Sequence, residues 1–307
     1  HRQTQSVTNQ IWRRAWLPGL LLVLLLLDAG SARAQEPAWE LQTGDVVNSV
    51  ALSADASLQV VGSRNNLVTA LDQTGQTRWQ FTPAGTVWGV AVSADGARIA
   101  VAAEDRRVYL LDNTGAKLWE YPGDYIFLDV AIARDGSLVA AVAEDRAVYA
   151  LDGASGALLW RTLLPNVADT VAIYGAQQAR VLAGTRDSQV HLFNTDGSEL
   201  WRAQLQNAVR GVAATGNGAR VVAVTDAGNV VMLNGATSNV LWTQSLGNRL
   251  RDVAISADGT LILTGGADST IFMLDGQDGA VQQSRALEAA IEAVALTPDG
   301  NFFMVGA

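Results

Sequence analysis

The chain has 307 residues, no cysteine and a formal net charge of −9 at pH 7. This length can bury a large core, and the lack of cysteine excludes disulfides and a thiol nucleophile. The acidic composition argues against nucleic acids and anionic lipid surfaces as partners, because both are bound through basic patches.

The first 34 residues predict an export signal. Arg13 and Arg14 precede an apolar run from Leu17 to Leu27, and Ala32-Arg33-Ala34 follows as a small-x-small cleavage sequence. The run is shorter than the roughly 20 residues that span a bilayer, so we interpret residues 1–34 as a signal peptide. Two alternatives stay open, an uncleaved membrane anchor and a twin-arginine signal, which exports folded proteins. The protein is then periplasmic, extracellular or associated with the cell envelope, and it touches a membrane only if this segment is retained.

After the signal, two short strands joined by a turn and ending in tryptophan recur along the chain. One copy, from Val148 to Trp160, reads VYALDGASGALLW. The tryptophans follow one another at steps of 40 or 41 residues, at Trp39, Trp79, Trp119, Trp160, Trp201 and Trp242. A fixed period of about 40 residues that contains several short strands is typical of the blades of a β-propeller.

Each repeat predicts four strands. The first strand carries a Val-Ala pair, and an Asp-Gly turn such as Asp95-Gly96 closes the first hairpin by supplying a positive φ. The copies with Asp55-Ala56 and Gly175-Ala176 lack this dipeptide, so we expect their turns to differ. The second strand is apolar and small, and a polar turn connects it to the third strand.

These repeats predict an all-β fold, a β-propeller of four-stranded blades over residues 35–307. A lone blade cannot cover both of its apolar faces, whereas stacking in a ring covers them. Six repeats are complete, from about residue 46 to 289, and the Trp39 strand closes the ring as the outermost strand of a partial seventh. The third strand of that blade is then missing, so we expect a truncated C-terminus and seven or eight blades in the complete molecule.

The pattern Ala150-x-Asp152-x-x-Ser155-Gly156-x-x-x-Trp160 resembles the tryptophan-docking repeat of quinoprotein dehydrogenases and their non-catalytic PQQ-like propeller relatives. Val253–Gly259 resembles the first half of a WD-type repeat, although the third strands here end in Leu-Asp instead of Trp-Asp. The resemblance covers about residues 38–307. It is specific for the fold and unspecific for function.

In that family the tryptophan packs against the neighbouring blade. The resemblance therefore implies a structural docking role for the six repeat tryptophans, Trp39, Trp79, Trp119, Trp160, Trp201 and Trp242. The sixth copy has Val281-Gln282-Gln283 where tryptophan would fall, so we expect a weaker docking contact there.

We expect no catalytic, cofactor-binding or metal-binding residue. His191, the only histidine after the signal segment, takes a position that other repeats fill with an aromatic ring, so we interpret it as structural. With one histidine after the signal segment and no cysteine, zinc sites and Cys- or His-dependent triads are strongly disfavoured. The adjacent cysteines that many quinone-dependent enzymes carry beside their cofactor are also absent.

Aspartates in the repeat are interpreted as structural. In five repeats one lies in the turn between the second and third strands and can bond the backbone two residues on, which we favour over calcium binding. These turn residues are Asp105, Asp145, Asp187, Asp226 and Asp268. Asp129 and Asp252 directly precede a Val-Ala pair, and we expect them to bond neighbouring backbone.

One position differs in chemistry from repeat to repeat, two residues before each valine of the Val-Ala pair. It is occupied by Asn48, Trp88, Leu128, Asp169, Arg210, Arg251 and Glu292. In a propeller these residues fall where the innermost strands begin, at the mouth of the central channel, on the same face as the turns between second and third strands. Because tryptophan and arginine are common interface anchors, we predict an interaction surface here.

The sequence therefore predicts an exported, non-enzymatic propeller that binds a protein or peptide and no nucleic acid. Envelope assembly factors with PQQ-like propellers are one model, although the lipid-anchor cysteine typical of them is missing. Two alternatives are a quinone-dependent dehydrogenase-like or other propeller enzyme, and the sensor domain of a longer protein.

Overall fold

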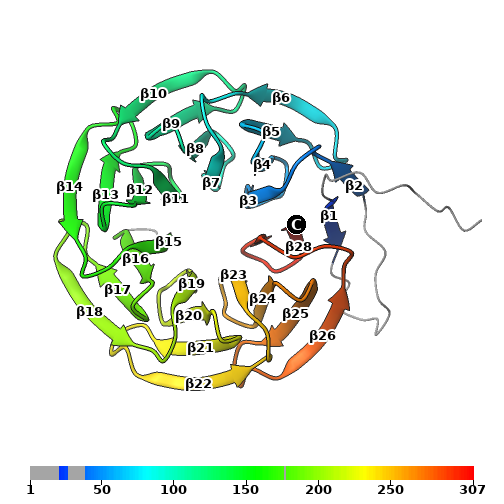
Figure 1. The fold of residues 1–307 in the computed structure, drawn as a ribbon, viewed down its shortest axis with the longest axis vertical. Coiled ribbons are helices and arrows are strands. Elements are labelled where there is room, and N and C mark those ends of the chain that lie inside the picture. Colours follow the sequence, from blue (N-terminus) through cyan, green and yellow to red (C-terminus); the bar gives the residue numbers. More distant parts are fainter. Residues whose placement is uncertain (1–20, 27–38, 176–177) are drawn as a thin grey trace, which may run out of the picture.

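The computed structural model describes residues 21–26, 39–175 and 178–307, and these form a closed ring of β-sheets (Figure 1). The described residues contain seven four-stranded antiparallel sheets arranged as the blades of a propeller. None of them belongs to a helix that is long and apolar enough to cross a membrane. The predicted all-β propeller is confirmed.

Six blades each consist of four consecutive strands, ordered from the centre of the ring outward. The first three blades are β3 (Val47–Leu52), β4 (Gln59–Ser63), β5 (Leu67–Leu71) and β6 (Thr77–Phe81); β7 (Val87–Val92), β8 (Arg98–Ala103), β9 (Arg107–Asp112) and β10 (Lys117–Pro122); and β11 (Phe127–Ile132), β12 (Leu138–Ala143), β13 (Ala147–Asp152) and β14 (Leu158–Leu163). The next three are β15 (Ala168–Tyr174), β16 (Arg180–Thr185), β17 (Gln189–Phe193) and β18 (Glu199–Gln204); β19 (Val209–Ala214), β20 (Arg220–Thr225), β21 (Asn229–Asn234) and β22 (Val240–Ser245); and β23 (Leu250–Ile255), β24 (Leu261–Gly266), β25 (Thr270–Asp275) and β26 (Val281–Ala286).

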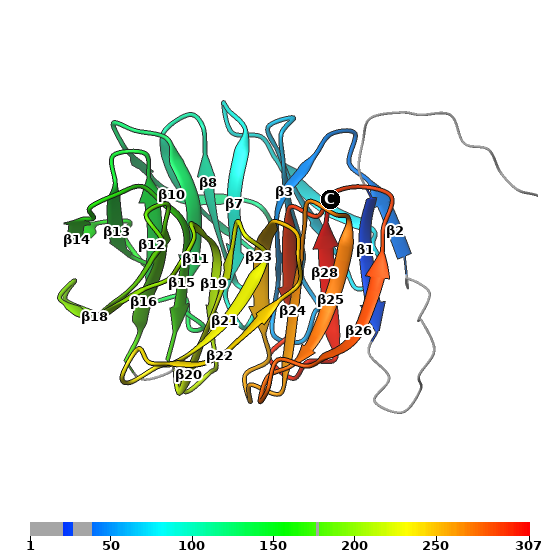
Figure 2. The same cartoon turned by 60° about the horizontal axis from the view of Figure 1, so that its bottom comes forward.

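The seventh blade joins segments from opposite ends of the sequence. From the centre outward it contains β27 (Ala293–Leu296), β28 (Phe302–Gly306), β1 (Leu21–Leu26) and β2 (Trp39–Gln42). The strand of Trp39 is therefore the outermost strand of this blade, as the sequence predicts. Figure 2 shows β28, β1 and β2 side by side next to the sixth blade.

The expectation of an empty third position in the seventh blade is wrong for this structure. β1 pairs antiparallel with both β28 and β2 and fills that position. Residues 21–26 belong to the predicted signal peptide, whose other residues lie outside the described part of the chain. Residues 21–26 cannot serve both as part of a cleaved signal peptide and as the third strand of the blade. Only a chain that retains them can form β1.

The hydrophobic core lies between neighbouring blades. Small and branched side chains from adjacent sheets pack face to face, so that Leu110 of the second blade belongs to the same core cluster as Val139 and Tyr149 of the third. The second and third strands are apolar on both faces and buried almost throughout. Each sheet therefore depends on its two neighbours to keep both faces away from water.

The repeat tryptophans lie over this core at the outer rim. The Trp119 ring rests on Gly156 of the next blade, where an added Cβ would come within 2.8 Å of the ring, and its indole N–H donates to the Gly153 carbonyl at 3.1 Å. Gly156 has a φ of 72°, a left-handed conformation that favours glycine. Trp39, Trp79, Trp160 and Trp201 likewise donate to a carbonyl of the following blade.

Two copies of this contact differ. The Trp242 ring lies against Gly279 of the sixth blade, but its indole nitrogen has no hydrogen-bond partner. In the sixth blade the equivalent residue, Gln283, is exposed on β26.

The first hairpin turn departs from the expectation drawn from its sequence. Ala56 adopts a φ of 55°, close to the 70° of Gly96, and its N–H donates to Ser53 just as that of Gly96 donates to Ser93. Asp55 and Ser53 make the same side-chain contacts as Asp95 and Ser93. The alanine is forced into the left-handed region by these bonds, so the turn is unchanged. The turn of the fourth copy lies partly outside the described residues.

Asp129 and Asp252 join neighbouring innermost strands. The Asp129 carboxylate accepts the N–H of Val130 on its own strand and of Val171 on β15, both at 2.8 Å. Asp252 accepts the N–H of Val253 and of Val294 on β27 in the same way. Each carboxylate therefore satisfies backbone donors at the inner edges of two blades.

Both aspartates lie deep in the ring, although each residue keeps part of its surface accessible to water. Burial raises the pKa of Asp129 to about 7 and that of Asp252 to about 6, and it outweighs the backbone N–H groups, which lower both pKa values. Their folded pKa values lie above the ordinary value, so the ring binds these protons more tightly than the unfolded chain does.

We predict that Trp119→Ala lowers the free energy of unfolding by about 2 to 3 kcal/mol, because it opens a gap between two blades. Leu118→Ala on the same strand is the control, since its side chain is 52% exposed and should change the value by less than about 0.5 kcal/mol. Urea denaturation followed by circular dichroism measures both, and equal effects would refute the docking role.

We predict that the free energy of unfolding falls as pH rises from about 4 to 7. In this range Asp129 and Asp252 have lost their protons in the unfolded chain but still hold them in the folded ring, so each rise in pH favours the unfolded chain. Each group contributes at most about 1.4 kcal/mol per pH unit. Asp129→Asn combined with Asp252→Asn should flatten the pH dependence measured by thermal denaturation. Asp135→Asn, whose carboxyl has a lowered pKa, should leave the slope in this window unchanged, and a wild-type curve that rises between pH 4 and 7 would contradict the assignment.

Candidate functional site

The seven variable residues lie at one face of the ring, which we call the mouth face. It is formed by the beginnings of the innermost strands and by the turns between second and third strands. All seven residues are half-buried: Asn48, Trp88, Leu128, Asp169, Arg210, Arg251 and Glu292. The strands of Trp88 and Leu128, β7 and β11, lie across the ring from β19 and β23, which carry Arg210 and Arg251 (Figure 1).

A β-bulge explains why this position can vary. In each of the first six blades, the register between the first and second strands shifts at the variable residue, as between Phe127 and Asp129 around Leu128. The residue before it is buried in the core between blades, and the valine two residues later is also buried. The bulged residue has no partner in the ladder, so its side chain can be changed without disturbing either core.

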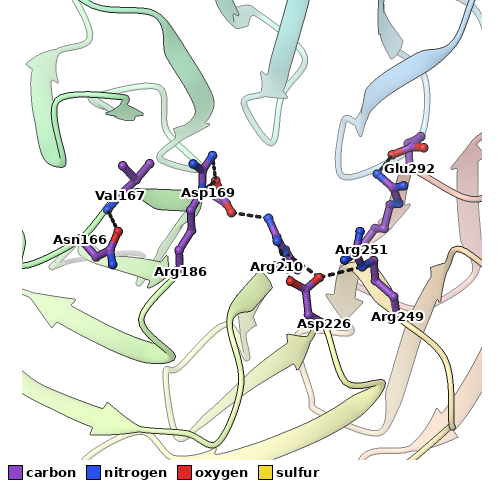
Figure 3. A network of polar contacts seen from close by, with 9 residues as sticks. All are labelled: Asn166, Val167, Asp169, Arg186, Arg210, Asp226, Arg249, Arg251 and Glu292. Atoms are coloured by element: carbon purple, nitrogen blue, oxygen red, sulfur yellow. Dashed lines mark hydrogen bonds and ion pairs between the residues drawn. The ribbon is translucent and has the colours of Figure 1, made fainter.

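Charged residues of the fourth to sixth blades form a connected arc. Arg210 makes a bidentate contact with Asp226 at 2.8 and 2.6 Å and a further contact with Asp169 at 2.5 Å. Arg186 contacts Asp169 at 2.7 Å, and Arg249 contacts Asp226 at 3.1 Å. Figure 3 shows Arg210 between the two aspartates.

The arc continues as a separate pair. Arg251 contacts Glu292 of the neighbouring blade at 2.6 Å, and the Arg251 Nε is buried with no hydrogen-bond partner. The hydrogen bond between Arg210 and Asp226 is the main cause of a raised pKa for the guanidinium and a lowered pKa for the carboxyl. Both groups therefore stay charged at neutral pH. We call Arg186, Arg210, Arg249, Arg251, Asp169, Asp226 and Glu292 the charged arc.

The other part of the mouth face is less polar. Asn48 donates to the Val87 carbonyl of the next blade at 2.9 Å and accepts from Arg64 at 3.3 Å. The Trp88 indole nitrogen is buried with no hydrogen-bond partner. Tyr125, in the loop that leads into β11, is 50% exposed. Trp88, Leu128 and Tyr125 thus offer apolar surface on adjacent blades.

Sequence reasoning did not single out Arg186 and Arg249 as site residues, and it interpreted Asp226 as a turn residue. Arg186 and Asp226 lie in turns between second and third strands, and Arg249 lies in the loop before β23. The sequence does indicate that these residues could belong to the site, because the predicted topology places these turns on the same face as the variable residues.

The other turn aspartates bond residues of their own blade or of the loop that leads into it. Asp105, Asp145 and Asp268 each accept the N–H of the residue two positions on, and Asp187 accepts the Thr185 hydroxyl. Asp105 and Asp145 also accept a tyrosine hydroxyl from the following strand, Tyr109 and Tyr149. Burial and this bond raise the pKa of Tyr149 to about 12.

His191 occupies the position of those tyrosines on β17. It is 1% exposed, stacks on Phe193 and lies 2.7 Å from Glu199 through Nδ1. The imidazole is therefore enclosed in a blade, away from the mouth face.

The residues at the mouth do not fit a calcium-quinone centre. Such a centre needs several oxygen ligands directed at one ion, whereas Asp169, Asp226 and Glu292 are each paired with arginine. Among the described residues, no three histidine, cysteine, aspartate or glutamate side chains come together closely enough to hold a metal ion.

Comparison with protein families gives a match over nearly the whole chain. The family described as outer membrane protein assembly factor BamB, built of PQQ-like repeats, matches residues 9–141, 64–173 and 144–301. The three matches overlap, as expected where similar blades can align in more than one register. No curated protein matches the sequence significantly. Together, the fold and the matches show that the chain is a PQQ-like repeat propeller of the outer membrane protein assembly factor BamB family.

Proposed function

We propose that this protein is an exported, non-enzymatic scaffold that binds a protein or peptide partner through its mouth face. The observation that carries the proposal is the ring of bulged residues. Each blade holds one half-buried side chain at the start of its innermost strand, and the chemistry of this side chain varies around the ring. A rigid frame with interchangeable side chains suits recognition, because little conformational entropy is lost on binding.

The chemistry of the mouth face supports a macromolecular partner. Trp88, Leu128 and the exposed Tyr125 provide apolar anchors, and the charged arc provides hydrogen-bonding groups across the ring. Interfaces commonly combine an aromatic core with arginine and a polar rim. The pairing of Asp169, Asp226 and Glu292 with arginine supports a binding role over catalysis, since it removes these three carboxylates as free acids, bases or ligands.

The family and the N-terminal sequence support an envelope location. The family is named for assembly at the outer membrane, and residues 1–34 have the pattern of an export signal. On this proposal the protein works on the periplasmic side of the outer membrane and holds a partner during assembly there.

We predict that Trp88→Ala combined with Leu128→Ala weakens capture of the partner from envelope extract by at least tenfold, since both anchors are lost. Quantitative mass spectrometry of pull-downs measures the loss against wild type. Leu159→Ala combined with Leu200→Ala is the control, because these leucines are exposed on the outermost strands.

A second variant distinguishes loss of binding from loss of folding. Leu128→Arg adds a bulky charge to the mouth face and opens no gap, and it should also reduce capture while thermal denaturation stays like wild type. Capture that survives in both mouth variants, or that is lost equally in the rim control, would show that the partner binds elsewhere.

A further inference from the structure

The outer layer of the charged arc is made of guanidinium groups. The side chains of Arg186 and Arg249 are 49% and 54% exposed, whereas those of Asp169 and Asp226 are 13% and 22% exposed. The same order holds in the second pair, where Arg251 is 37% and Glu292 17% exposed. A ligand that approaches this part of the mouth face meets arginine first.

The charges of the arc also differ from those of the rest of the chain. Four arginines face three carboxylates, an excess of one positive charge on a chain whose formal charge is −9. Asp187 and Asp268 flank the arc and bond in their own turns, with Thr185 and Thr270 and, for Asp268, also with Asn248. The excess of positive charge is therefore confined to the seven residues of the charged arc. Across the ring, the turns of the second and third blades carry exposed charges of both signs, Glu104 with Arg106 and Glu144 with Arg146, and Asp124 is exposed in the loop before β11.

This arrangement favours a ligand with negatively charged groups. The arginines already hold carboxylates in the close and bidentate geometry that guanidinium groups favour, so a further carboxylate can join the same network without rearranging it. Polyanions such as nucleic acid or an anionic membrane are disfavoured, because the acidic remainder of the chain repels an extended negative surface.

We propose that the charged arc binds an acidic segment of the partner, one that carries at least two aspartate or glutamate side chains. The inference rests on the proposed function, in which the mouth face holds a protein or peptide. It orients that partner, with acidic residues over the fourth to sixth blades and apolar residues over Trp88 and Leu128.

The test uses short labelled peptides that carry the proposed acidic groups, so it does not require the partner itself. Fluorescence anisotropy at low ionic strength compares an eight-residue probe of alternating Glu and Gly with one of alternating Lys and Gly, using the full chain. The Glu probe should bind and should weaken at least tenfold between 20 and about 200 mM salt. Binding of the Lys probe alone would overturn the proposal.

Arg186→Glu combined with Arg249→Glu should weaken binding of the Glu probe at least tenfold. Arg186→Gln combined with Arg249→Gln should give a smaller loss in the same direction, and it avoids placing new carboxylates beside Asp169 and Asp226. The matched control, Arg78→Glu with Arg202→Glu, makes the same charge change at exposed positions on the outermost strands β6 and β18 and should stay within twofold of wild type.

Equal losses in the arc and control variants would show a general charge effect and overturn the proposal. Tighter binding of single-stranded DNA or of anionic vesicles, lost in the same arc variants, would overturn the assignment to a peptide. The envelope pull-down separates the two hypotheses. If arc variants keep the partner while the Trp88 and Leu128 variant loses it, the mouth-face function stands and the acidic-segment proposal fails.

Discussion

The structure depends on one constraint: a blade of this sequence is apolar on both faces and cannot cover either one alone. Val139, Ala141 and Tyr149 of the third blade face the second, while Val142 and Val148 face the fourth. Closure of the ring therefore supplies most of the hydrophobic stabilisation, and each tryptophan that reaches the next blade reinforces it. Near the centre, Asp129 and Asp252 also link neighbouring blades, because each accepts backbone N–H groups from two innermost strands.

The mouth face follows from this constraint. Core packing fixes the residues on both sides of each bulge, and the bulge frees one residue per blade from the ladder. The repeat thereby separates residues that hold the ring, such as Val130, from residues that can specify a ligand, such as Leu128. Ion pairs between blades, for example Arg210 with Asp169 and Arg251 with Glu292, then order the variable side chains without a dedicated binding loop.

The period of the tryptophans and the valines predicts the blades, the strand order and the closing role of Trp39, because local patterns determine all three. The pairings within the charged arc could not be predicted to the same depth. Arg186 and Arg249 come from different turns, and only the curvature of the ring decides which carboxylate each one reaches. At Ala56 the local sequence is misleading. The dipeptide Asp55-Ala56 predicts a turn unlike those of the other repeats, but hydrogen bonds of Ser53 and Asp55 hold the same turn as in the other repeats. The third position of the seventh blade was equally beyond local patterns, as β1 comes from a segment that reads as an export signal.

The most direct measurement of the central claim is site-specific photo-crosslinking in intact cells. A photoreactive residue would be placed at Leu128 or Arg249 on the mouth face, and at Leu159 on the outer rim. The account predicts that both mouth positions crosslink to the same envelope protein and that the rim position does not. Crosslinks to that protein from position 159 alone would show that the partner binds the rim, and the mouth face would then have no recognition role.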